Sequence, residues 1–358
     1  MASVYKKIES TSFFIGKTSD GLISFGSGQP DLPPPKRIFR AARRFKNFRY
    51  GFIQGEENLR SALAKEYPHA KADHFVITNG ASEALDILLR AIARPGGKVL
   101  LPKPYYYSYP HNVRLAGMVP EYYCLKNGKI DLNDLEKKIR GCVAILINSP
   151  ANPTGSVQDI PVLKAIEVLA ERFNVCVISD EIYKDIIYER ENYLIQGKNV
   201  CTINSFSKTF AMCGLRVGYL YTKNREIVEK VVEIKTHTSM NTNTLAQEMA
   251  YEALQAPKSL IVKQTAIWKE RRDYIYESMI GLGLDVWKPE GAFYIFPKFK
   301  DPTRVMHDLF YKYKLVTYDG TWFGDPTRLR FSYALDIKKI GEGMARLEKF
   351  LKKEYRHY

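Results

Sequence analysis

The sequence has no run of roughly 18 consecutive apolar residues, the length at which a segment becomes a candidate for crossing a membrane as a helix. Residues 1–7 also lack the apolar stretch of a secretion signal. We therefore expect a cytoplasmic protein that makes no contact with a membrane.

Cysteine is scarce, and none of the five cysteines forms a CxxC pair. They are Cys124, Cys142, Cys176, Cys201 and Cys213. This spacing indicates neither a zinc knuckle nor a disulfide framework. Cys213 lies close in sequence to a lysine discussed below, but a small buried filler is its expected role.

Positive charge is in excess without being concentrated. The chain has 54 Lys and Arg against 39 Asp and Glu, a formal net charge of +15. Basic residues are dispersed apart from short runs such as 40–44 and 349–353, and no helix-turn-helix, RNP or zinc-finger signature accompanies them. We interpret the charge as a source of solubility and of attraction for phosphate-bearing cofactors and carboxylate substrates, not as a specific nucleic-acid site.

Strand and helix patterns alternate along the first two thirds of the chain. A short strand is expected at residues 75–78, followed by a glycine turn and by an amphipathic helix at 83–92. Further strands are expected at 98–101, 143–147, 175–179, 202–204 and 218–221, with a helix at 160–172. This alternation predicts an α/β fold with a mostly parallel sheet between two layers of helices.

The 358 residues are enough for about two domains. A helix-rich stretch at 244–280 precedes short strands expected at 293–296, 315–317 and 329–331, which suggests a smaller α+β domain. We assign residues 38–243 to the large domain, and residues 1–37 and 244–358 to the small one.

The most informative stretch is SFSKTFAMCGLRVGY, residues 205–219. It sets Lys208 among small, mostly uncharged residues, with Ser205 three positions before it and Arg216 eight after it. A lysine held away from water is available as a nucleophile and forms Schiff bases with carbonyl compounds, pyridoxal phosphate (PLP) among them. Ser205 and Arg216 would then be ligands of its phosphate. A solvated lysine beside a glycine turn is the alternative, and it is the commoner case for an isolated SxxK.

Other polar residues follow predicted strands or begin predicted helices. Gly80, Ala81 and Ser82 lie where a helix begins, and its free N–H groups could bind a phosphate, although most such turns are only turns. Asp180 ends a strand and could pair with a pyridine nitrogen, with a helix N-cap as the alternative. Tyr183 could point to the same ring.

Three further motifs have both an ordinary and a functional interpretation. Asn152, in NPTG, marks either a turn or an amide that bonds a phenolic oxygen. The tyrosine-rich loop at 104–110 is either a surface loop or an aromatic face for stacking. Arg330 is either an edge residue of a strand or a planar fork for a substrate carboxylate.

Together these motifs carry a resemblance. The order GAS–EAL, PxYY, NPTG, DEIY, SxSKxxxxxGxRxGY, EGAFY and RxSYA resembles the fold-type I PLP-dependent enzymes, and within them the class I/II aminotransferases of the aspartate aminotransferase-like superfamily. It covers roughly residues 20–340. The resemblance implies a large three-layer α/β/α domain and a reaction that moves an amino group between an L-amino acid and a 2-oxo acid by a ping-pong mechanism.

The resemblance also implies roles for individual residues. Lys208 would be the Schiff-base lysine and the proton-transfer base, Asp180 would pair with the pyridine nitrogen, and Tyr106 would stack on the ring. Asn152 and Tyr183 would bond the phenolic oxygen, and the phosphate would be held by Gly80, Ala81, Ser82, Ser205 and Arg216. Arg330, with Asn152 and the backbone near Gly28, would bind the substrate α-carboxylate. Tyr50 would reach the phosphate of a neighbouring subunit, so a homodimer with shared active sites is expected.

The substrate stays open at this point. Some bacterial aspartate aminotransferases have a lysine at the position of Ser82, so serine there weakens the case for a dicarboxylate. A PLP-dependent C–S β-lyase and a threonine-phosphate-type decarboxylase use the same residues and are the alternatives. A PLP-binding regulatory module without turnover is a third possibility, but no fused DNA-binding domain accompanies the fold.

Overall fold

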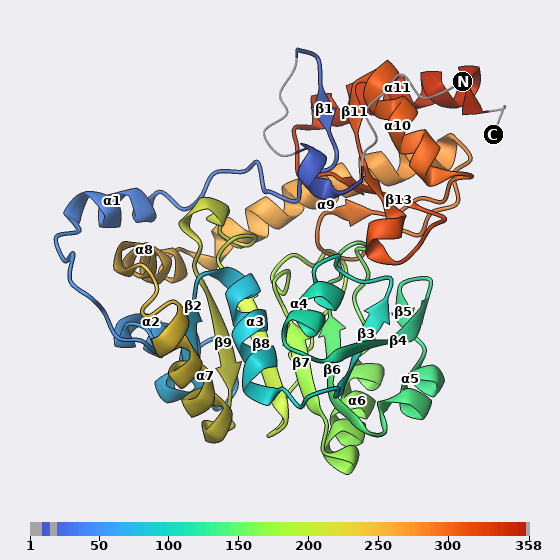
Figure 1. Ribbon diagram of the computed structural model, residues 1–358. Coiled ribbons are helices and arrows are strands. Elements are labelled where there is room, and N and C mark those ends of the chain that lie inside the picture. Colours follow the sequence, from blue (N-terminus) through green and yellow to red (C-terminus); the bar gives the residue numbers. More distant parts are fainter. Residues whose placement is uncertain (1–8, 15–19, 356–358) are drawn as a thin grey trace.

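The computed structural model describes residues 9–14 and 20–355. At its centre is an eight-stranded sheet in the order β2-β9-β8-β7-β6-β3-β4-β5 (Figure 1). Its strands are β2 (Phe75–Thr78), β3 (Lys98–Lys103), β4 (Val119–Lys126), β5 (Lys129–Ile130), β6 (Cys142–Asn148), β7 (Cys176–Asp180), β8 (Val200–Ser205) and β9 (Gly218–Thr222). The five strands from β8 to β4 run parallel, whereas β9 is antiparallel to both of its neighbours and β5 to β4.

Helices cover both faces of this sheet, as the continuous apolar strands predict. The helices around the large sheet are α2 (Glu57–Ala64), α3 (Gly80–Ile92), α4 (Tyr109–Leu115), α5 (Leu132–Ile139), α6 (Ile160–Phe173), α7 (Arg225–Thr238) and α8 (Thr244–Leu254). Because side chains alternate along a strand, Leu146 of β6 packs with α3, α4 and α7, while Ile145 and Ile147 pack with α5 and α6. The three-layer α/β/α arrangement is confirmed.

Two small sheets form a second core above the carboxyl ends of these strands (Figure 1). β1 (Ile23–Ser24) pairs with β11 (Leu315–Val316), and β13 (Leu329–Ser332) lies between β10 (Tyr294–Ile295) and β12 (Tyr318–Asp319). The accompanying helices are α9 (Lys258–Gly281), α10 (Pro302–Tyr313) and α11 (Ile337–Lys353). The smaller α+β unit is therefore also confirmed.

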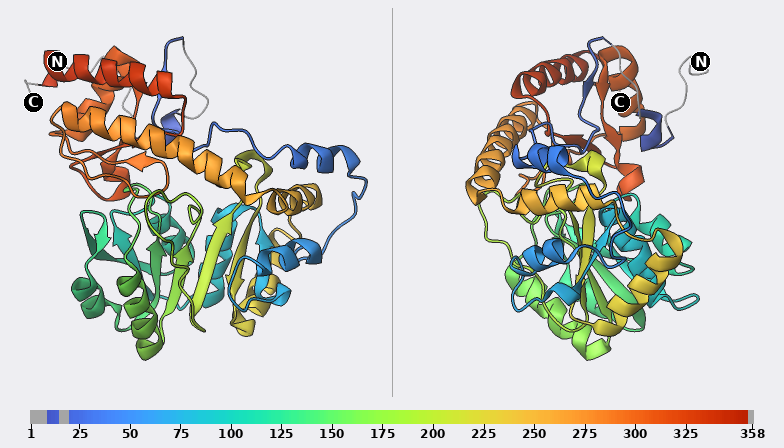
Figure 2. Two further views of the ribbon diagram at one scale, coloured as in Figure 1. Left: turned by 180° about the vertical axis from the view of Figure 1, so that it is seen from behind. Right: turned by 90° about the vertical axis from the view of Figure 1, so that its left-hand side faces the viewer.

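The helix-rich stretch expected at 244–280 is two helices, α8 and α9, which separate at Pro257 because proline begins a helix more readily than it continues one. α8 packs with α1 (Arg37–Arg44), α2 and the β2 side of the large sheet. From there α9 runs across the molecule to the small sheets (Figure 2). The domain boundaries at 37/38 and 243/244 remain a prediction.

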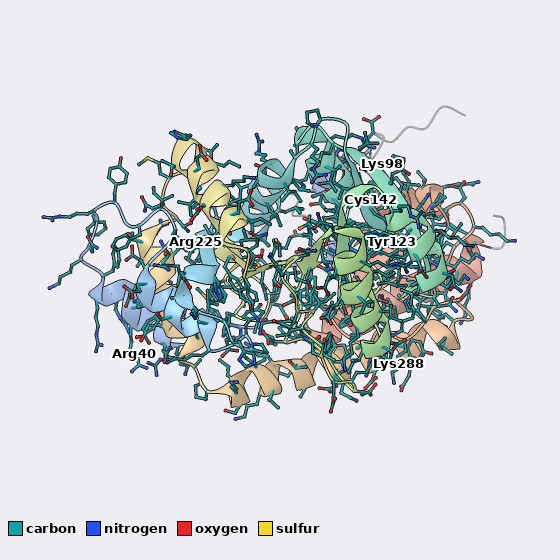
Figure 3. The ribbon with its side chains drawn as sticks, turned by 90° about the horizontal axis from the view of Figure 1, so that it is seen from below. Arg40, Lys98, Tyr123, Cys142, Arg225 and Lys288 are labelled. Atoms are coloured by element: carbon teal, nitrogen blue, oxygen red, sulfur yellow. The ribbon has the colours of Figure 1, made fainter. Side chains whose placement is uncertain are left out.

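Basic side chains are spread around the molecule: Arg40, Lys98, Arg225 and Lys288 lie well apart in the view from below (Figure 3). Within residues 9–14 and 20–355, no helix is both long and apolar enough to span a bilayer. The first seven residues, on which the absence of a secretion signal was argued, lie outside the described part.

Candidate active site

A cavity of about 640 Å³ lies between the carboxyl ends of the large-sheet strands and the small sheets. Most of the residues predicted for a site line it. They are Gly28, Ala81, Ser82, Tyr106, Asn152, Asp180, Tyr183, Ser205, Lys208, Arg216 and Arg330. The parallel strands explain the convergence, because side chains that follow neighbouring parallel strands meet at one edge of the sheet.

Lys208 lies in the turn after β8. Its Nζ donates a hydrogen bond to the carbonyl oxygen of Gly28, at 2.7 Å, and lies 6.0 Å from the centre of the Phe293 ring. Lys208 thus meets a backbone segment that lies 180 positions earlier in the chain.

Positive charge and free N–H groups meet at the start of α3. Gly80 begins this helix with φ +79°, and a Cβ on it would lie 2.5 Å from Nη2 of Arg216. Arg216 is itself held by the carbonyl oxygen of Cys213, at 3.0 Å from Nη1. A helix N-terminus beside a guanidinium is suited to binding an anion such as a phosphate.

Asp180 ends β7 and is 7% exposed. Its Oδ2 accepts a hydrogen bond from the Tyr109 hydroxyl at 2.6 Å, and its Oδ1 accepts one from the Ile182 N–H at 3.2 Å. Burial raises the pKa of Asp180 to about 6, while these two donors and the nearby Lys208 act in the opposite direction. Residues 182–185 form a turn, so the helix N-cap interpretation of Asp180 is wrong.

Arg330 lies in β13, the central strand of its sheet, so it is not an edge residue. It is 2% exposed; its Nη1 donates to Asn152 Oδ1 at 3.0 Å and its Nη2 to the Gly26 carbonyl at 2.5 Å. Its Nε is buried and has no hydrogen-bond partner among the described residues. A guanidinium with an unused N–H group at a cavity can bind a carboxylate.

Three aromatic rings enclose the Arg330 guanidinium, those of Tyr294, Tyr318 and Phe323, with centres 4.5, 4.7 and 4.8 Å from its Cζ. The Tyr294 hydroxyl also pairs with that of Tyr183 at 2.8 Å. This hydrogen bond joins two residues that are 111 positions apart, and it links the loop after β7 to β10.

The sequence reasoning missed several lining residues. Tyr109, which lies in the same tyrosine-rich loop as the predicted Tyr106, is the hydrogen-bond donor to Asp180. Asn148 donates to the Asp180 carbonyl and accepts from the Asn152 N–H. Because it is the last residue of β6, the search for polar residues at the ends of predicted strands could have found it. Tyr318 carried no local signal, because only the pairing of β12 with β13 brings it to Arg330.

Of the predicted residues, Gly80 and Tyr50 do not line the cavity; Gly80 lies against Arg216, which does, whereas Tyr50 lies apart from it. Tyr50 lies in the loop between α1 and α2, its side chain is 82% exposed, and it belongs to a different surface hollow with Phe48 and Met240. This placement agrees with the expectation that it serves a neighbouring subunit, which stays a prediction.

Comparison with known proteins places most of the chain in one family. The profile described as aminotransferase class I and II matches residues 20–347. The probable aspartate/prephenate aminotransferase of Aquifex aeolicus is 34% identical over 92% of this chain and 91% of that protein, and the aspartate aminotransferase of Thermotoga maritima is 33% identical over 94% and 93%.

Solved structures agree with the sequence relatives. The crystal structure of aspartate aminotransferase from Thermotoga maritima superposes with a TM-score of 0.90 at 31% identity, over 96% of this chain and 95% of that one. The aromatic aminotransferase of Pyrococcus horikoshii OT3 superposes with a TM-score of 0.89 at 30% identity, over 96% and 99%.

Proposed function

The chain belongs to the class I and II aminotransferase family, and we propose that it binds pyridoxal 5′-phosphate in the cavity at Lys208. In this proposal it moves an amino group between an L-amino acid and a 2-oxo acid by a ping-pong mechanism. The observation that supports it best is the meeting of a lysine amine, a buried carboxylate and two guanidinium groups around one cavity at the strand ends.

The residues present fit the cofactor. Gly80, Ala81, Ser82, Ser205 and Arg216 would hold the phosphate, since they combine helix N–H groups, hydroxyls and a positive charge. Asp180 would keep the ring nitrogen protonated, and Tyr106 would stack on the ring. Asn152 and Tyr183 would bond the phenolic oxygen.

When bound, PLP supplies an aldehyde for the substrate amine and a ring that withdraws electrons from Cα. The chain supplies binding and proton transfer. Arg330 would hold the α-carboxylate, helped by Asn152 and the backbone near Gly28, and so fix the orientation of the Cα–H bond. Lys208 Nζ would move the proton from Cα to C4′ of the cofactor in the first half of the cycle, and would move a proton from C4′ to Cα in the second half.

The test is a visible absorption titration of the PLP-loaded protein. A productive amino donor should remove the band of the bound cofactor and a 2-oxo acid should restore it. Lys208→Ala should lose the band and turnover, whereas Lys223→Ala, a lysine outside the cavity, should keep both. A wild-type protein without a band would contradict the assignment. Pyruvate and ammonia released from a sulfur amino acid would instead indicate the C–S lyase, which the comparisons do not favour.

The same titration identifies the donor class. Among the described residues that line the cavity, the cations are Lys208, Arg216 and Arg330, and each has a proposed role already. The wall of the cavity beside Arg330 is aromatic instead: Tyr318 packs on the guanidinium, and Phe14 stacks on Tyr318 at 5.7 Å between ring centres. We therefore propose an aromatic donor, and expect tyrosine or phenylalanine to act at lower concentration than aspartate.

We also propose a cytoplasmic homodimer with two shared active sites. Its support is the exposure of Tyr50, together with the neighbouring Phe48 and Phe52, on a loop that extends from the body of the molecule (Figure 1). In the dimer Tyr50 would complete the phosphate site of the partner.

A further inference from the structure

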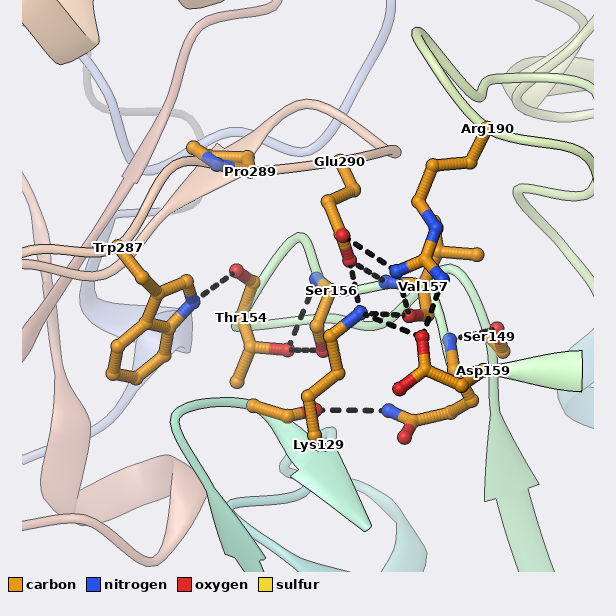
Figure 4. A network of polar contacts seen from close by, with 12 residues as sticks. Lys129, Ser149, Thr154, Ser156, Val157, Asp159, Arg190, Trp287, Pro289 and Glu290 are labelled. Atoms are coloured by element: carbon orange, nitrogen blue, oxygen red, sulfur yellow. Dashed lines mark hydrogen bonds and ion pairs between the residues drawn. The ribbon is translucent and has the colours of Figure 1, made fainter. Parts of the chain in front are cut away.

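A network of charged side chains lies where the segment before β10 meets the large domain (Figure 4). At its centre is Glu290, just before β10. Its Oε1 accepts from Arg190 Nη1 at 2.6 Å, and its Oε2 accepts from the Lys129 ammonium and from the Val157 N–H, the latter at 3.1 Å. Asp159 bonds Arg190 in turn and lies 3.7 Å from Lys129 Nζ. Carboxylates and cations therefore alternate around Glu290.

Backbone contacts hold three segments of this network together: residues 152–159, residues 183–190 and residues 290–294. The N–H groups of Glu290 and Gly291 both donate to the Gly155 carbonyl, at 2.8 and 2.9 Å, and the Tyr188 N–H donates to the Glu290 carbonyl at 3.1 Å. Gly155 has φ +66°, and a Cβ on it would lie 2.6 Å from the Tyr294 carbonyl oxygen. The segments thus approach at backbone distance, where a small displacement of one must move the others.

Each segment carries a residue of the proposed site. Asn152 lies three positions before Gly155, Tyr183 lies in the loop that leads to Arg190, and Tyr294 follows Glu290 by four positions. The hydroxyls of Tyr183 and Tyr294 pair at 2.8 Å, and Asn152 accepts from Arg330 at 3.0 Å. The Ala292 N–H donates to the Ile186 carbonyl between them, at 2.9 Å.

We propose that Glu290 is a positioning residue: it clamps the loops that carry Asn152 and Tyr183 onto the segment that carries Tyr294, and so sets the geometry of the phenolic-oxygen side of the cofactor site. This deepens the proposed function and rests on it for the roles of Asn152 and Tyr183. Without the negative charge of Glu290, Arg190 and Lys129 would share Asp159 alone and the contact to the Val157 N–H would weaken, so the loops would separate.

Hydrogen exchange on the full chain tests the clamp without any cofactor. In Glu290→Gln, amide exchange at Val157, Glu290 and Gly291 should become roughly tenfold faster, the effect of losing a local contact, with α9 unchanged. Glu354→Gln is the matched control. Glu354 also accepts from two side chains, Lys312 at 2.7 Å and Tyr313 at 2.9 Å, and its side chain is 29% exposed against 28% for Glu290.

A double-mutant cycle on PLP affinity then separates positioning from general stability. Glu290→Gln should weaken PLP binding roughly tenfold in the wild type and clearly less in a Tyr183→Phe background, because both changes act on the same contact. Lys129→Gln should act in the same direction and serves if Glu290→Gln does not fold. Unchanged exchange at the three amides, or additive effects in the cycle, would overturn the proposal. A wild type that binds no PLP would overturn the proposed function instead, and the exchange data would still decide on the clamp.

Discussion

At the scale of single residues, Asp180 shows how neighbours tune a buried acid. Its pKa is raised from 3.8 to about 6 because burial disfavours the charged carboxylate, and the Tyr109 hydroxyl limits the rise by donating to it. The unfolded chain releases this proton at lower pH than the folded one. The apoprotein should therefore lose stability as the pH rises from about 4 to about 6, and the contribution should stay constant above that range.

The pH dependence of PLP binding follows from the same carboxyl group. Asp180 must be ionised to pair with a protonated ring nitrogen, so PLP affinity should fall as the pH drops through about 6. Tyr109→Phe removes a donor from the carboxylate and should move that midpoint upward. Tyr107→Phe is the control, because the Tyr107 ring packs on Tyr106, at 4.6 Å between ring centres, and the hydroxyl that donates to Asp180 is that of Tyr109. Dissociation constants of PLP measured from pH 5 to 8 give this midpoint for each protein. A midpoint in Tyr109→Phe that is identical to that of the wild type would contradict the role of Tyr109.

At the scale of elements, the antiparallel strand β9 closes the anion site. Its first residue, Gly218, pairs with Ser205 of β8 and touches the start of α3: a Cβ on Gly218 would lie 2.6 Å from the Gly80 carbonyl carbon and 2.8 Å from the Ala81 nitrogen. Both are backbone atoms, which cannot move aside as a flexible side chain can.

Gly218→Ala should therefore push β9 and α3 apart. We expect a loss of about 1–3 kcal/mol in the free energy of unfolding, typical of overpacking, and weaker binding of inorganic phosphate to the apoprotein. Gly214→Ala, in the same SxSKxxxxxGxRxGY stretch but with open space around the glycine, should be neutral in both. Urea unfolding and phosphate titration measure the two effects, and equal behaviour of the two variants would refute this account.

At the scale of the whole molecule, the loop between α1 and α2 leaves large apolar side chains in water. Phe48 is 85% exposed, and Tyr50 and Phe52, which follow it in the same loop, are 82% and 67% exposed. A patch of this kind is typical of a surface that another protein covers, here a second copy of the chain.

Phe48→Glu should yield monomers in sedimentation velocity experiments and weaken PLP binding, because Tyr50 would no longer reach the partner's phosphate site. Val168→Glu, at an exposed apolar position on α6, should leave the dimer intact. A wild type that sediments as a monomer while binding PLP tightly would refute the shared site.

Much of this molecule could be predicted from local sequence. Strand and helix positions, the three-layer fold and the residues after strand ends all depend on periodicity and on residue type, which are visible within a short window. Lys208, Asp180, Asn152 and Arg330 were found in this way, and the cavity brings them together.

Tertiary structure alone decided the rest. The antiparallel placement of β9, the bond from Tyr109 to Asp180 across 71 positions and the contact of Lys129 with Glu290 across 161 positions leave no trace in any one stretch of sequence. Such contacts form because burying the apolar faces of distant segments fixes which polar groups meet, and that energy belongs to the assembled core rather than to local residues.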